Sequence, residues 1–380
     1  VCTLPAGTGS NRDVVVTTLG RTSNAATFSY AGPFLSSITP ASGATAGNIP
    51  LTINGLNFAA GSTVAVGGSN CPVVSQSGSV AIVCTLPPGQ GRDREIRVTS
   101  AGTTSNTATF SYDAPVISAV APANPSTAGG SILTLTGTSF GTTGSVTVGG
   151  SPCPITSHDH GMVTCILPAG QGTGRDVVLG VAGQPSNAFP LSYAAPGLAG
   201  ISPASGPAAG SIPLTLTGTN FGTASSVSVG GRDCPVTSQG HTALQCTLPP
   251  GLGADVPVVV SAGGQASNAL PFDYPTPTLA GVSPASGPTD GGIPLTLTGT
   301  NFGSAATVSV GGQPCPLTDQ SPTSVVCTLP PGQGVARSVQ LTTDGAASNT
   351  LLFDYDAPAI SAIEPASGPT AGNVPITVRG

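Results

Sequence analysis

One stretch of this sequence returns along the chain at an almost constant interval. Residues 206–250 are repeated at 287–331 with few changes, and looser copies occupy 128–168 and 43–88. A tyrosine closes each unit, and successive tyrosines lie 82, 81, 81 and 81 residues apart. A chain that repeats one unit at a fixed period is expected to fold as an array of similar domains. These tyrosines are Tyr30, Tyr112, Tyr193, Tyr274 and Tyr355.

The repeat divides the 380 residues into four complete units of 79 or 80 residues and two partial ones. Residues 1–30 match the back of a unit, and residues 358–380 match the front of one. We therefore expect this chain to be a window from a longer array. The complete units span 33–112, 115–193, 196–274 and 277–355.

Charged residues are scarce, and this scarcity argues against several classes of partner. They make up 6% of the chain, against about 25% in ordinary globular proteins. All nine basic residues are arginine, and the formal net charge is −6. Such a chain cannot neutralise a phosphate backbone, so we expect no nucleic-acid partner. No apolar run approaches the roughly 18 residues that a membrane helix needs, so we expect no membrane span in this stretch.

Eight of the nine cysteines form pairs that recur once in each complete unit. The two members of a pair lie 12 or 13 residues apart. One pair per unit predicts one disulfide per domain, and with it an oxidising compartment. A zinc site would need two further ligands beside each pair, and the chain has three histidines, so we expect no metal and no cofactor. The expected pairs are Cys71 with Cys84, Cys153 with Cys165, Cys234 with Cys246 and Cys315 with Cys327.

Within one unit the pattern is that of short strands separated by turns. Leu214 and Leu216 alternate with threonines, as in a strand with one buried face. The turn that follows contains Phe221, which we expect to close the end of the core. Seven such strands in a unit of this size, with no helical period, predict a small all-β sandwich. In the unit 196–274 the predicted strands are 198–202, 214–217, 227–229, 234–237, 244–248, 256–261 and 269–274.

The motif Ile-x-Pro-x-x-Gly-Pro-x-x-Gly-x-x-Pro-Leu-Thr-Leu-Thr-Gly-x-Asn-Phe-Gly runs from Ile201 to Gly222, and the two cysteines and Pro250 follow it. It resembles the IPT/TIG domain, the immunoglobulin-like module of plexins, growth-factor receptors and some transcription factors. The resemblance covers the whole chain and implies an early-set immunoglobulin-like sandwich. It implies no single function, because domains of this family act as spacers, as adhesive modules and as accessories to DNA binding.

One cluster has the residue types of a catalytic or metal site. His158, Asp159 and His160 lie in the hairpin between two cysteines of one unit, where the other units have different residues. The simplest interpretation is a solvated hairpin tip; a surface metal site and a general base are the alternatives. The linkers between units carry at most one carboxylate, too few for the six to eight oxygens that calcium takes. We therefore expect no catalytic residue and no metal ligand.

A Ser-Asn pair precedes the last strand of every unit. Serine and asparagine commonly hydrogen-bond to their own backbone at turns, so we interpret these pairs as structural. They are Ser23 and Asn24, Ser105 and Asn106, Ser186 and Asn187, Ser267 and Asn268, and Ser348 and Asn349.

The threonines opposite the buried leucines should face solvent. Threonine is a good strand residue, and that alone could explain them. The alternative is O-glycosylation, because a surface with so little charge needs another source of solvation. The candidate sites are Thr134, Thr136, Thr215, Thr217, Thr296 and Thr298 in the Leu-Thr-Leu-Thr strands, and Thr85, Thr247 and Thr328 after the second cysteines.

These observations predict a non-enzymatic structural protein, located outside the cell or at its surface. We expect tandem sandwiches arranged as an extended rod, since the linkers are two residues long and next to proline. The leading interpretation is a filament or stalk in which repeats or chains contact one another, with O-linked sugar on its surface. The alternative is an adhesin or receptor ectodomain in which the repeats space out a binding domain elsewhere. Near-identity of the units favours the filament. A ligand site would make one unit differ from the others in exposed aromatic residues or charge, and we expect no such difference.

Overall fold

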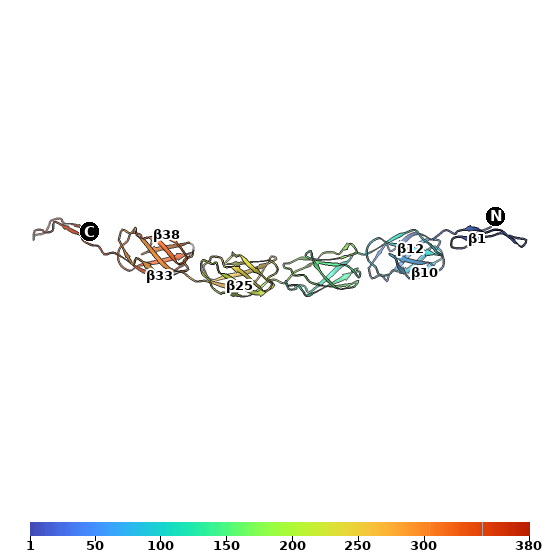
Figure 1. Cartoon of the computed structure of the whole chain (residues 1–380), viewed down its shortest axis with the longest axis horizontal. Helices are drawn as coiled ribbons and strands as arrows, with labels where there is room; N and C mark the ends of the chain where they lie inside the picture. The colour runs from blue at the N-terminus through green and yellow to red at the C-terminus, as the bar shows by residue number, and fades with distance from the viewer. Residues whose placement is uncertain (304, 344) are drawn as a thin grey trace. The chain divides into compact units, whose positions relative to one another are not determined.

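The computed structural model describes residues 1–303, 305–343 and 345–380, and this part of the chain consists of strands, turns and loops without a helix (Figure 1). It forms two compact units, Val1–Ala194 and Ala195–Gly380. Each unit holds two complete repeats and one partial repeat. The all-β fold expected from the sequence is confirmed.

Each complete repeat folds into two sheets, and the third repeat serves as the example. Its four-stranded sheet has the order β24-β25-β29-β28, and the facing sheet has the order β27-β26-β30-β31, with β32 also paired to β30. The strands of the first sheet are β24 (Gly197–Ser202), β25 (Pro213–Thr219), β29 (Ala243–Thr247) and β28 (Val236–Gln239). Those of the second are β27 (Arg232–Cys234), β26 (Ser225–Val229), β30 (Gly253–Ala262), β31 (Gln265–Ala266) and β32 (Leu270–Tyr274).

The other complete repeats have the same plan. The first contains β5 (Phe34–Thr39), β7 (Pro50–Leu56), β11 (Ala81–Thr85) and β10 (Val73–Ser77) in one sheet, and β6 (Ser42–Gly43), β14 (Ala108–Tyr112), β12 (Arg94–Ser100), β8 (Thr63–Val66), β9 (Ser69–Cys71) and β13 (Thr103–Thr104) in the other. The second contains β15 (Val116–Ala121), β16 (Ile132–Thr138), β20 (Met162–Ile166) and β19 (Ile155–His158), facing β18 (Ser151–Cys153), β17 (Ser145–Val148), β21 (Arg175–Val181), β22 (Gln184–Pro185) and β23 (Phe189–Leu191).

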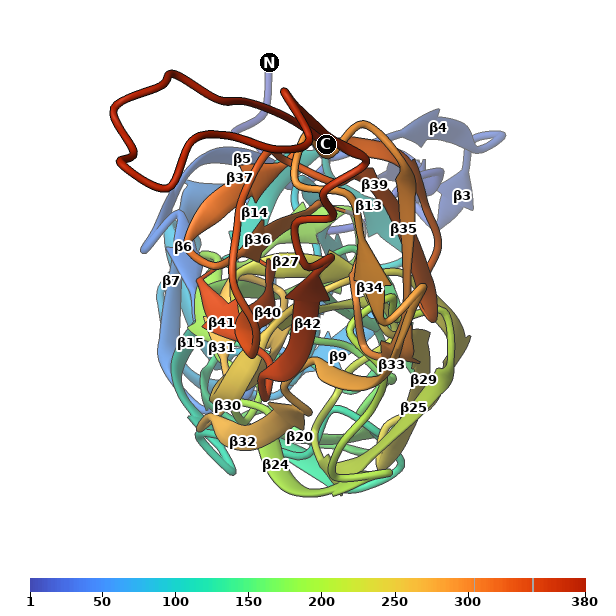
Figure 2. The same cartoon turned by 90° about the vertical axis from the view of Figure 1, so that its left-hand side faces the viewer.

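The fourth repeat has β33 (Thr278–Ser283), β35 (Pro294–Thr300), β39 (Ser324–Thr328) and β38 (Leu317–Gln320) in one sheet. The other sheet contains β34 (Ser286–Gly287), β42 (Leu351–Tyr355), β40 (Arg337–Thr343), β36 (Ala306–Val310), β37 (Gln313–Cys315) and β41 (Ala346–Ala347). Figure 2 shows β35 and β39 on one side of this repeat and β40 and β42 on the other. The partial repeats form the short pairs β1 (Arg12–Val14) with β4 (Ala26–Phe28), β2 (Thr17–Thr18) with β3 (Arg21–Thr22), and β43 (Ala362–Glu364) with β44 (Thr377–Arg379).

The core of each repeat lies between its two sheets. On β25 the side chains of Leu214 and Leu216 are fully buried, while the threonines between and after them point outward. Phe221, in the turn after β25, is also fully buried and packs in the same cluster. The alternation along β25 therefore buries the leucines, as the sequence predicts, and leaves the threonine hydroxyls outside. Phe221 is buried as predicted from its place in the following turn.

One predicted strand proved to be two strands in different sheets. The segment 234–237 was expected to be continuous, but Cys234 ends β27, and β28 starts at Val236 in the facing sheet. Pro235 lies between them, and proline has no N–H to continue a ladder of hydrogen bonds. The chain therefore crosses between the sheets at this proline.

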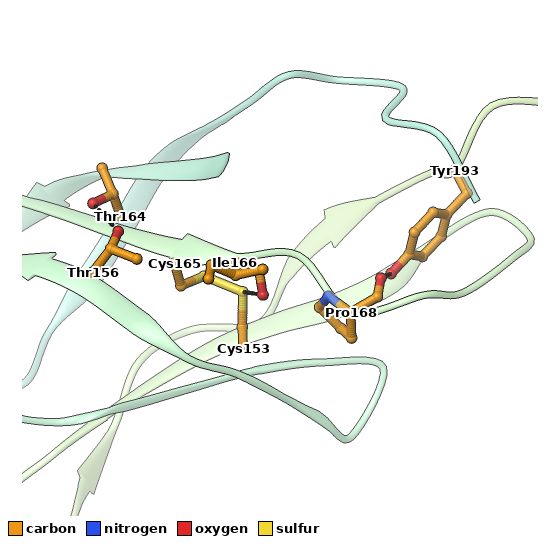
Figure 3. Close-up of a disulfide and its surroundings, with 7 residues drawn as sticks. All are labelled: Cys153, Thr156, Thr164, Cys165, Ile166, Pro168 and Tyr193. Carbon is orange, nitrogen blue, oxygen red and sulfur yellow. Dashed lines mark hydrogen bonds between the residues drawn. A yellow bond between two sulfur atoms is a disulfide. The ribbon is translucent and has the colours of Figure 1, made fainter. Parts of the chain in front are cut away.

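This crossing makes the disulfide a link between sheets. Cys234 belongs to the sheet of β26, and Cys246 lies on β29 of the other sheet, with their Cα atoms 5.5 Å apart. Both half-cystines are buried in the core cluster. The same link joins Cys71 to Cys84, Cys153 to Cys165 (Figure 3) and Cys315 to Cys327.

Replacing both cysteines of the third repeat tests how much one cross-link contributes. Closing a loop of about a dozen residues should stabilise the repeat by about 3 kcal/mol, and a domain this small has little core to compensate. We expect C234A/C246A to lose that amount of protection against amide hydrogen exchange in residues 196–274. The other three repeats serve as internal controls. Unchanged exchange in the third repeat would contradict the expectation.

The tyrosine that ends each repeat is tied to the loop after the second cysteine. The hydroxyl of Tyr274 donates a hydrogen bond of 2.8 Å to the carbonyl of Pro249, and its ring packs edge-on against Phe272 with the centroids 5.1 Å apart. Burial raises the pKa of Tyr274 to about 12, an effect that the charge of Arg232 partly offsets. Matching bonds join Tyr112 to Pro87, Tyr193 to Pro168 (Figure 3) and Tyr355 to Pro330.

This raised pKa makes stability depend on alkaline pH. The native state favours the protonated phenol of Tyr274, so its contribution is complete below the ordinary tyrosine pKa of 10.0 and is lost as the pH rises through about 12. We expect the free energy of unfolding of the third repeat to fall across this window, measured by hydrogen exchange or denaturant titration alongside tyrosinate absorbance. In Y274F the free energy of unfolding should fall less over the same pH range, because phenylalanine has no hydroxyl to ionise. Ionisation of Tyr274 near pH 10 in a fully folded repeat would contradict the account.

Candidate functional surface

The histidine cluster of the second repeat does not converge on one point. The Nε2 of His158 donates a hydrogen bond of 2.7 Å to the carbonyl of Phe140, whereas the Nδ1 of His160 lies 2.9 Å from Thr45 Oγ1 in the preceding repeat. The Asp159 carboxylate accepts a hydrogen bond from the backbone N–H of His160. Our interpretation as a solvated tip is therefore wrong for both histidines. They are engaged in structural contacts with different partners.

His158 makes a bond that glutamines make in the other repeats. The matching glutamines donate from Nε2 to the carbonyl of the equivalent phenylalanine, with lengths of 3.2, 3.5 and 3.4 Å. These residues are Gln76, Gln239 and Gln320, which bond to Phe58, Phe221 and Phe302. The shared role is to hold the turn that carries the buried phenylalanine. Across residues 1–303, 305–343 and 345–380, no three His, Cys, Asp or Glu side chains group as metal ligands would.

The Ser-Asn pairs are structural, but the asparagine reaches much farther than a turn. Ser267 acts locally, since its hydroxyl accepts from the N–H of Val260 and donates to the carbonyl of Asn268. The Asn268 amide bonds to both the N–H and the carbonyl of Leu198, at 3.0 and 2.9 Å. That residue lies 70 positions earlier, on the first strand of the repeat. The asparagine thus ties the end of the repeat to its beginning, in the opposite sheet.

All nine candidate threonines lie on the outward side of the four-stranded sheets. Thr136, Thr217 and Thr298 are exposed, and the other six are partly covered by neighbouring side chains. In the third repeat Thr215 lies opposite Gln245, whose amide is 3.4 Å from its hydroxyl. In the second repeat the hydroxyls of Thr156 and Thr164 hydrogen-bond at 2.8 Å (Figure 3). We call this outward side the threonine face.

The threonine face is almost free of charge. In the described strands of the four sheets that carry it, Asp319 is the single Asp, Glu, Lys or Arg. The facing sheets carry the charges instead, for example Glu95 and Arg97, which form an exposed ion pair at 3.3 Å. In the third and fourth repeats the threonine face therefore offers mainly hydroxyls and amides, whereas in the first two repeats it also exposes apolar side chains such as Leu56, Ile132 and Met162. The other side of each repeat carries scattered charges.

The first repeat differs from the others, contrary to expectation. Phe34 and Leu56 are paired across β5 and β7, and both are half exposed. The matching positions of Phe34 hold Val116, Gly197 and Thr278. This repeat also concentrates charge, with four charged residues in a row at 92–95 and a fifth at Arg97. The units are thus not equivalent in exposed aromatic residues or in charge.

Sequence comparison matches the four complete repeats to a known domain family and finds related proteins. A family model described as IPT/TIG domain matches residues 33–112, 115–193, 196–274 and 277–355. Fibrocystin-L of Homo sapiens is 31% identical over 379 residues, an alignment that covers 91% of this chain and 9% of that protein. Plexin-B3 of Homo sapiens is 32% identical over 214 residues, covering 52% of this chain and 11% of that protein.

A solved structure of the plexin A4 extracellular region is 16% identical, with a TM-score of 0.24, and covers 84% of this chain and 48% of that one. The chain spans about a tenth of the length of the curated relatives described above. Within the described residues, no helix has the length and apolar character to cross a membrane.

Substitution of His158 tests whether its role is only to donate the hydrogen bond to the carbonyl of Phe140. Because glutamine makes the same bond in three repeats, we expect H158Q to keep the unfolding free energy of the second repeat within about 0.5 kcal/mol. H158A removes the donor and should lower it by about 1 kcal/mol. Hydrogen exchange of residues 115–193 measures both variants. Equal losses in both would show that the histidine ring does something that glutamine cannot do.

Proposed function

The chain belongs to the IPT/TIG domain family, and we propose that it serves as a structural spacer outside the cell, with O-linked sugar on its threonine face. The observation that carries this proposal is the threonine face, whose exposed threonine recurs in the second, third and fourth repeats and which has almost no charge. Charged side chains normally keep proteins apart in solution. A bare face of this kind would promote association, whereas attached sugar would solvate it and shield the edges of the sheet.

The oxidising compartment is supported by the cross-link in each repeat. Four disulfides join the two sheets of their domains, and such bonds persist outside the cell. Linkers of two residues, such as Ala194 and Ala195 beside Pro196, support an extended array, because they leave less freedom than a Gly/Ser linker. We propose contacts between repeats, and between chains in a filament, as the partners of this array.

A second candidate function is the spacer of a receptor or adhesin ectodomain. Its support comes from the relatives, since fibrocystin-L and plexin-B3 are far longer than this chain. Phe34, paired with Leu56, also gives the first repeat an exposed aromatic side chain that the other complete repeats lack in the described residues. In this case the array would hold a binding domain at a distance, and the threonine face would have the same solvating role.

Glycopeptide mapping of the protein from its native source tests the sugar coat. We expect O-linked sugar on the exposed residues Thr136, Thr217 and Thr298, because a transferase can reach their hydroxyls without unfolding the sheet. The partly covered threonines should carry less. Threonines that point into the core or the joints, such as the buried Thr45, are matched controls and should be bare. An intact mass equal to that of the polypeptide would contradict the coat and favour lateral association of bare sheets.

A further inference from the structure

The first two complete repeats meet through a buried threonine. Thr45 lies in the loop between β6 and β7 of the first repeat and is 1% exposed. Its hydroxyl oxygen accepts a hydrogen bond of 3.1 Å from the N–H of Gly141, and it lies 2.9 Å from the Nδ1 of His160. Both partners belong to the second repeat. A single hydroxyl therefore contacts two separate loops of the neighbouring domain.

A glutamine in the first repeat forms hydrogen bonds to the same loop through both the oxygen and the nitrogen of its side-chain amide. Gln90 Oε1 accepts from the backbone N–H of Thr142 at 3.0 Å, and its Nε2 donates to the hydroxyl of Thr143 at 2.7 Å. Gly141 precedes them with a φ of +66°, and a Cβ at that position would collide with the Gln90 amide. The positive φ favours glycine at this point of the loop, and the absence of a Cβ leaves room for the Gln90 amide.

A second glutamine makes a similar contact in the opposite direction. Gln184, on β22 of the second repeat, is 5% exposed. Its Nε2 donates to the carbonyl of Tyr112 at 3.1 Å, and its Oε1 accepts from Arg92 Nε at 3.0 Å. Both of these groups belong to the first repeat. Together with Thr45 and Gln90, this contact connects the repeats at three places around the two-residue linker.

The corresponding positions between the third and fourth repeats lack these groups. Thr45 and Gln90 correspond to Ala208 and Leu252 of the third repeat, and the partners His160 and Gln184 correspond to Pro322 and Ala346 of the fourth. None of these four side chains can donate or accept a hydrogen bond. The linker is again two residues long. The two joints therefore differ in side-chain chemistry and not in linker length.

We propose that Thr45, Gln90, His160 and Gln184 form an interdomain clasp that holds the first and second repeats at a fixed angle, and that the joint between the third and fourth repeats is a hinge. Hydrogen bonds at three separated places resist both bending and twisting about the linker. The four matching side chains at the other joint cannot form these directional bonds, so we expect that joint to tolerate a wider range of angles. The array thus combines a stiff segment with a compliant one, and this inference does not depend on the sugar coat.

Distances between spin labels in the full 380-residue chain test the proposal. One labelled chain carries labels at Ser69 and Ser151 in the first two repeats, and a second carries them at the equivalent Arg232 and Gln313 in the last two. All four positions are exposed. The labels are attached through a keto amino acid, so that the disulfides stay intact. We expect the first distance distribution to be narrower than the second. Equal widths in the unaltered chain would overturn the proposal without any clasp variant.

Variants of the clasp residues test whether the clasp causes the difference in width between the two distance distributions. Q90A/Q184A should broaden the first distribution to the width of the second and leave the second unchanged. Q333A, at the exposed counterpart of Gln90 in the fourth repeat, is the matched control and should change neither. The transplant A208T/L252Q/P322H/A346Q should narrow the second distribution. Thermal unfolding confirms that each variant is folded. A first distribution that keeps its width in folded Q90A/Q184A would contradict the clasp.

Discussion

The fold of every repeat depends on burying one side of a small four-stranded sheet. The central strand alternates leucine with threonine, so that Leu214 and Leu216 enter the core while Thr215 and Thr217 remain outside. A domain of about 80 residues buries a limited core, and the cross-link between Cys234 and Cys246 fastens the two sheets to each other across it. The threonine face is thus a direct consequence of the same alternation that builds the core.

Local sequence pattern was sufficient to predict most of the strands, the buried phenylalanine and the cysteine pairs, because each depends on spacing within a few residues. It failed where tertiary contacts decide. The amide of Asn268 reaches back 70 residues to Leu198, and no short pattern indicates that partner. His160 meets Thr45 of another repeat, a contact that depends on how domains dock. The sequence does contain a signal for the crossing at Pro235, since proline interrupts a ladder of hydrogen bonds, but the prediction of one strand over 234–237 did not use it.

The differences between repeats matter as much as their likeness. The exposed threonine recurs in the second, third and fourth repeats, and it supports a solvating role for this face. The exposed Phe34 and Leu56 occur in the first repeat, and the clasp residues join it to the second. A spacer with a stiff segment and a hinge can hold a surface at a set orientation while the rest of the array bends. This combination suits a filament and also suits an ectodomain that presents a binding surface.

Electron microscopy of the native protein tests the central claim, that the repeats act as a structural spacer outside the cell. The account predicts a linear row of beads at the cell surface or in the extracellular matrix. Each bead should be about 30–40 Å long, judged from strand rise and end loops. A uniform continuous row would favour the filament, and a row that ends in a larger terminal domain would favour the ectodomain. A compact globule in which the repeats fold back on one another would contradict the account.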